Sequence, residues 1–168
     1  MRTSYIARVR REGWTAAAAH AWRVSVAVFV LRVMLGGLLL AAGALKIGHA
    51  TELAAAMAGF RLLPGAAVGP LALALPFFEI VLGLYLVLGL LTRVVAAVAP
   101  GQFLVYAAAV ASAVVRHIPA NCGCFGPQDV AVADWPHVGF DLALAAAGVL
   151  IAWQAPGAFA LDRRLRHA

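Results

Sequence analysis

Charged side chains are scarce in this sequence. They make up 12% of its 168 residues, whereas ordinary soluble domains carry about a quarter. Acidic residues are the rarer kind, with seven Asp and Glu against thirteen Lys and Arg. Together with a hydrophobic content of 64%, this shortage excludes a disordered tail and most water-soluble globular domains, which need charge to cover their surface.

Cysteine is almost as scarce, with Cys122 and Cys124 as the two in the chain. Two cysteines exclude a disulfide framework and a four-cysteine zinc site. A close pair such as this one can still form one local disulfide, provided that the backbone turns at Gly123.

The sequence is instead rich in long apolar runs. The mean hydropathy is +0.93, and apolar runs of about 20 residues recur, which is the length that crosses about 30 Å of hydrocarbon. We therefore predict an all-α integral membrane protein whose four-helix bundle occupies residues 24–155 and contacts the lipid bilayer. The predicted spans are 24–45, 71–91, 94–115 and 135–155.

Some polar and small residues have predicted structural roles. Thr92 and Asp134 stand at the starts of the third and fourth spans and are predicted N-caps. His137 and Asp141 lie four residues apart on one helix face, which favours a local pair. Close packing or hydrogen bonding between helices is expected at Gly36, Gly37, Gly83 and Gln102.

The basic residues indicate a topology. The net charge is +6, but no basic patch with interleaved aromatic residues is present, so we predict no nucleic-acid partner. Nine Lys and Arg lie in a basic arm (1–23), the turn at Arg93 and a basic tail (156–168), against three in the two opposite loops. The positive-inside rule then places both termini in the cytoplasm of a multi-pass plasma-membrane protein, and the cysteine loop on the extracytoplasmic side.

The Cys122-Gly123-Cys124 segment is the sharpest chemical signal. A ring this small is strained, and strained, exposed disulfides are the labile and catalytic kind. The segment therefore favours thiol–disulfide exchange, with an inert loop staple as the structural alternative. Cys-X-Cys beside scattered histidines is not a standard zinc spacing, so we assign no metal site.

Glu79 is a second signal, because a carboxylate inside a predicted span is costly and requires a partner or a wet cavity. Arg32 inside the first span and Lys46 at the outer end of the same helix are the candidate partners. These charges fit either a structural ion pair or a polar pocket that binds a quinone-like acceptor or relays protons.

Several segments resemble the MauE/DoxX-like family of small four-helix membrane proteins. The resemblance runs from about residue 30 to 153 and rests on four segments: LRVMLGGLLLAAGALKI (31–47), FRLLP (60–64), LPFFEIVLGLYLVLG (75–89) and NCGCFG (121–126). It implies a redox-associated membrane protein that works with a thioredoxin-like partner in the maturation of methylamine dehydrogenase, a disulfide-rich periplasmic enzyme. The positions that match the family pattern are Lys46, Glu79, Cys122 and Cys124, together with Arg32.

These observations predict a membrane thiol–disulfide redox protein. Cys122 and Cys124 would exchange disulfides with an extracytoplasmic thioredoxin-like partner. A quinone bound near Glu79, Arg32 and Lys46 would accept electrons from the cysteines or supply electrons to them. This activity would make the protein a thiol–disulfide oxidoreductase. One alternative is a non-enzymatic membrane assembly factor with a structural cysteine loop, and another is a small transporter or metal-handling membrane protein.

Overall fold

The computed structural model describes residues 2–121 and 132–165. Among the described residues, the regular secondary structure is helical apart from one isolated antiparallel bridge between Asn121 and Val132, which confirms the predicted all-α class. Its helices are α1 (Arg2–Lys46), α2 (Ala50–Gly59), α3 (Gly65–Leu88), α4 (Thr92–Val115), α5 (Trp135–Gln154) and α6 (Leu161–Leu165).

Four of these helices are long and apolar enough to cross a membrane, as predicted. They are Ala17–Lys46 within α1, Gly65–Leu88, Thr92–Val115 and Trp135–Gln154. The second begins at Gly65, earlier than the predicted residue 71, and the first lies within one continuous helix, α1, that also includes the predicted basic arm. The alanine-rich stretch 16–19 favours this continuity because alanine is the best helix former. The second continues through Pro70 and Pro76, since neighbouring helices in a membrane bundle can compensate for the lost backbone donors.

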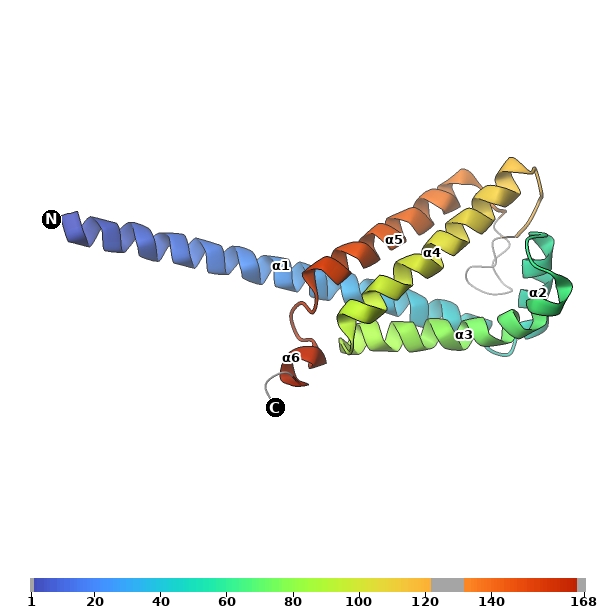
Figure 1. Ribbon diagram of the computed structural model, residues 1–168, viewed down its shortest axis with the longest axis horizontal. Helices are drawn as coiled ribbons and strands as arrows, with labels where there is room; N and C mark the ends of the chain where they lie inside the picture. Colours follow the sequence, from blue (N-terminus) through green and yellow to red (C-terminus); the bar gives the residue numbers. More distant parts are fainter. Residues whose placement is uncertain (1, 122–131, 166–168) are drawn as a thin grey trace.

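The helices pack as two main pairs, α1 against α3 and α4 against α5 (Figure 1). The α1–α3 pair closes on small residues: a Cβ atom added to Gly83 would lie 2.6 Å from the carbonyl oxygen of Gly36. Gly36 and Gly83 therefore confirm the predicted close approach. Gly37 does not, because its missing side chain faces open space.

The α3–α4 turn is held by the distant C-terminal segment. The two carboxylate oxygens of Asp162 accept hydrogen bonds from the backbone N–H groups of Leu91 and Thr92, each at 2.8 Å. The prediction that Thr92 caps α4 was wrong, since Thr92 is already the first helical residue. Figure 1 shows α6 beside this turn, while α1 runs past the bundle toward the N-terminus.

The opposite end of the bundle carries α2 and the connection between α4 and α5, and we call it the loop end (Figure 1). Asp134 caps α5 as predicted, because its side chain accepts a hydrogen bond from the backbone N–H of His137. Ala133 donates a backbone hydrogen bond to Ala120 at 2.9 Å. This bond and the Asn121–Val132 bridge bring the two flanks of segment 122–131 together at the loop end.

Candidate functional site

Cys122 and Cys124 lie outside the described residues, but the described flanks of their segment are anchored. Ala120 and Ala133 are buried in an apolar cluster with Phe60 at the end of α2 and Val110 on α4. Arg116 adds a polar tie, because its Nη1 donates to the carbonyl oxygen of Phe60 at 3.0 Å. Both described flanks therefore lie at the same end of the bundle as α2.

Lys46 and Glu79 form a buried ion pair between α1 and α3. Lys46 Nζ lies 2.8 Å from each carboxylate oxygen of Glu79, and the two side chains are 2% and 1% exposed. Lys46 ends α1, whereas Glu79 lies in the second half of α3. Of the two partners considered for Glu79, the structure selects Lys46.

Two side chains of α4 complete the cluster around Glu79. The Tyr106 hydroxyl donates to Glu79 Oε1 at 2.7 Å, and Gln102 Nε2 donates to the same oxygen at 3.1 Å. Gln102 also donates to the Tyr106 hydroxyl at 3.0 Å. This confirms that Gln102 bonds between helices. Sequence reasoning missed Tyr106, although its place one turn after Gln102 on an apolar helix was a usable signal.

Arg32 lies elsewhere. It is fourteen residues before Lys46 on the same helix, about 21 Å along the axis at 1.5 Å per residue. Its guanidinium is fully buried and donates to the carbonyl oxygens of Pro156 and Ala158, at 2.7 and 3.4 Å. The structure thus groups Lys46 with Glu79 and places Arg32 under the C-terminal segment.

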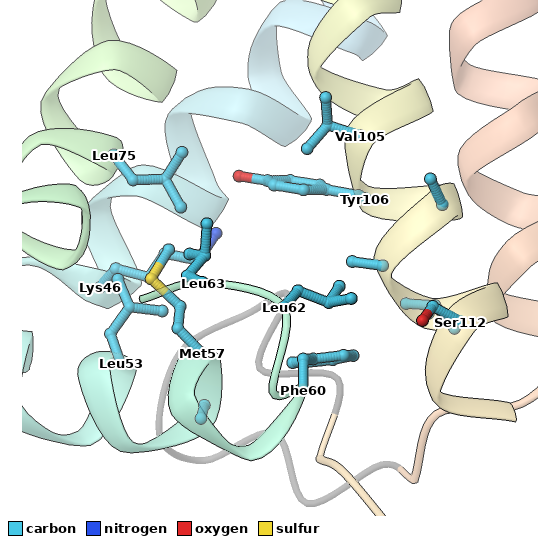
Figure 2. A pocket seen from close by; sticks show the side chains of 14 residues that line it. Lys46, Leu53, Met57, Phe60, Leu62, Leu63, Leu75, Val105, Tyr106 and Ser112 are labelled. Atoms are coloured by element: carbon cyan, nitrogen blue, oxygen red, sulfur yellow. The ribbon is translucent and has the colours of Figure 1, made fainter. Parts of the chain in front are cut away.

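A cavity of about 430 Å³ adjoins the Lys46–Glu79 pair. Most of its wall is aliphatic and comes from α2, α3, α4 and the connection 60–63, as Figure 2 shows. Its polar wall groups are Lys46, Tyr106 and Ser112. Because the lining residues Leu62, Leu63 and Val105 are 46%, 40% and 66% exposed, the cavity reaches the surface of the bundle on its apolar side.

His137 and Asp141 line one small cavity, but the hydrogen-bond partner of the His137 ring is Asp134 and not Asp141. The ring Nδ1 of His137 contacts Asp134 Oδ1, to which the His137 backbone N–H also donates. These two hydrogen bonds hold the pKa of Asp134 below its usual range. Among residues 17–121 and 132–162, whose side chains the structure describes, no three His, Cys, Asp or Glu side chains gather closely enough to ligate a metal.

Comparison with known proteins gives one consistent result. A family model described as methylamine utilisation protein MauE matches residues 24–154. The methylamine utilization protein MauE of Paracoccus denitrificans is 34% identical to this chain over 132 residues, which cover 78% of this chain and 71% of that relative. No solved structure matches the chain. The matched range includes Lys46, Glu79, Cys122 and Cys124.

Proposed function

This chain belongs to the MauE family of membrane proteins, and we propose that it is a membrane thiol–disulfide oxidoreductase coupled to quinone. Cys122 and Cys124 exchange disulfides with an extracytoplasmic thioredoxin-like partner and so support the maturation of an exported, disulfide-rich enzyme of the methylamine dehydrogenase type. The single observation that carries the quinone coupling is the apolar cavity beside the buried Lys46–Glu79–Tyr106 cluster.

The exchange step follows from the cysteine chemistry. In the oxidising direction, a thiolate of the partner attacks the Cys122–Cys124 disulfide and forms a mixed disulfide, and the partner's second thiolate then resolves it. The partner gains a disulfide, and Cys122 and Cys124 become thiols. Reoxidation of these thiols transfers two electrons and two protons to one quinone, which becomes a quinol. The reducing direction has the same stoichiometry.

The cavity has the composition that a quinone requires. Its aliphatic wall suits a ring with an isoprenoid tail, and its exposed aliphatic rim allows entry from the membrane. Glu79 accepts two of the three ammonium protons of Lys46, which leaves one donor for a ligand carbonyl. The Tyr106 hydroxyl provides a second polar contact on the α4 side (Figure 2).

The proposed side of action comes from the distribution of basic residues. The arm, the Arg93 turn and the tail hold most of the Lys and Arg, which favours a cytoplasmic position for that end. The loop end then lies outside the plasma membrane, where disulfides persist. The described flanks of the cysteine segment and the cavity share this end, so the proposed electron transfer does not require electrons to cross the bilayer.

Cysteine trapping tests the exchange. In cells, Cys122→Ser and Cys124→Ser variants are expected to accumulate a mixed disulfide, which forms when the remaining thiolate attacks the disulfide of a thioredoxin-like protein and releases that protein's other cysteine as a thiolate. The double serine variant is the matched control and should trap nothing. Full maturation of the exported enzyme in cells that carry the double variant would contradict the proposal.

Filling the cavity tests the quinone coupling separately. Ala109 is half-buried and lines the cavity, whereas Ala97 is exposed on the same helix and does not. In purified protein in lipid nanodiscs, Ala109→Phe should slow quinone-dependent oxidation of the partner by about tenfold, whereas Ala97→Phe should leave it unchanged. Disulfide exchange with the partner should be the same in both. Equal quinone-dependent rates in the two variants would remove the cavity from the mechanism.

A further inference from the structure

A second, smaller cavity lies on the α5 side of the Glu79 cluster. Its volume is about 40 Å³, and its polar lining consists of Glu79, Tyr106, His137 and Asp141. Tyr106 lines this cavity and the large one. A space of this size is large enough for at least one ordered water molecule, which needs about 10–15 Å³ and two to four polar partners.

Asp141 is the unexplained group in this cavity. Its side chain is 4% exposed, and its Oδ2 atom has no hydrogen-bond partner among the described residues. Buried carboxylate oxygens are almost always hydrogen-bonded to protein or to water. Asp141 lies on the second turn of α5 and lines the small cavity, so a water molecule in this cavity would give its Oδ2 atom a hydrogen-bond partner.

His137 connects this cavity to the outside. It lies one turn before Asp141, also lines the cavity, and its side chain is 31% exposed at the loop end. The other titratable groups that line the cavity are Glu79 on α3 and Tyr106 on α4, with Lys46 behind Glu79. The α1 lining is aliphatic. Titratable groups thus extend from the loop-end surface to the Lys46–Glu79 pair.

We propose that this cavity is a hydrated proton pathway in which Asp141 passes protons between His137 at the loop end and the buried Glu79–Tyr106 cluster. Proton exchange along the pathway does not depend on any redox step. Its use for quinone rests on the proposed function, because one reduced quinone takes up two protons and the large cavity shares Tyr106 with this one. The two protons released by the cysteine thiols balance that uptake.

Infrared spectroscopy tests the pathway without any quinone. In wild-type protein in nanodiscs, a carboxyl band should respond to a step in bulk pH and to transfer into D₂O. Asp141→Asn should abolish that band, while Glu52→Gln, which removes an exposed carboxylate on α2, should not. Thermal unfolding checks that each variant is folded. The proposal is overturned if the wild-type spectrum shows no Asp141 band that responds to bulk pH and solvent.

A second variant distinguishes the role of the cavity water from the role of the Asp141 carboxylate. Ala42 lines the cavity and is 7% exposed, so Ala42→Val reduces the water space and keeps Asp141. We expect the Asp141 band to persist in this variant but to exchange with D₂O about tenfold more slowly. Unchanged exchange would contradict the hydrated pathway. Cysteine trapping in Asp141→Asn should remain normal, so failure of the pathway and failure of disulfide exchange give different results.

Discussion

At the scale of single residues, the most constrained group is the Glu79 carboxylate. It accepts hydrogen bonds from Lys46, Tyr106 and Gln102, and no part of this cluster is more than partly exposed. The cost of burying a charge in an apolar bundle is offset only while each charge keeps its partner. Lys46 therefore has two roles: it neutralises Glu79, and it presents a cation to the large cavity.

This dependence predicts a specific pattern of stability. Lys46→Met alone and Glu79→Gln alone should each lower the free energy of unfolding by about 3–5 kcal/mol, because each leaves one buried charge without its counter-ion. The double variant should lose much less, since it removes both charges. Chemical denaturation in detergent micelles measures the three values. Additive losses in the double variant would show that the two charges are not coupled.

At the scale of helices, the α1–α3 contact decides where Lys46 meets Glu79. Gly36 lies against Gly83, and a Cβ atom on Gly43 would lie 2.7 Å from the carbonyl oxygen of Pro76. Both contacts require that no side chain separates the helices. The close approach sets their relative height, so that the last residue of α1 reaches the middle of α3.

Two neighbouring glycines provide a matched test of this contact. A Cβ atom on Gly36 would lie 2.8 Å from the carbonyl oxygen of Gly83, whereas one on Gly37 would meet nothing within 4 Å. Gly36→Ala should destabilise the protein by about 1–3 kcal/mol through overpacking. Gly37→Ala should be neutral or should stabilise it by up to about 1 kcal/mol through helix propensity. The thermal midpoints of the two variants check this, and equal midpoints would exclude close packing at Gly36.

At the scale of the whole molecule, the two ends of the bundle are built differently. At the end away from the loops, residues 156–162 bind α1 and the α3–α4 turn: Ala158 donates to Ser25, and Asp162 donates through its backbone to Gly89. Arg32 lies beneath this segment. The loop end instead carries both cavities and the anchored flanks of the cysteine segment. The C-terminal segment covers one end of the bundle, and the cavities of the proposed mechanism lie at the other.

The orientation of these ends is testable by accessibility. In a cysteine-free background made by Cys122→Ser and Cys124→Ser, Thr51→Cys marks α2 at the loop end and Thr3→Cys marks the arm. A membrane-impermeant maleimide should label Thr51→Cys in intact cells and should reach Thr3→Cys only after lysis. The reverse pattern would place the cysteine segment in the cytoplasm and exclude an extracytoplasmic partner.

Much of this organisation follows from residue order alone. The four spans, the Asp134 cap and the need of Glu79 for a partner are local properties, since they depend on hydropathy over about 20 residues and on the chemistry of one side chain. The cysteine pair is also evident from the sequence. Its reactivity remains a prediction because Cys122 and Cys124 lie outside the described residues.

The choice between possible partners required the folded bundle. Lys46 rather than Arg32 neutralises Glu79, Asp162 rather than Thr92 caps α4, and Tyr106 and Asp141 line one cavity. Each of these contacts joins separate helices. Helical periodicity shows which residues share a face, but the close approach of glycine-bearing helices and the return of the C-terminal segment decide which faces meet and at what height.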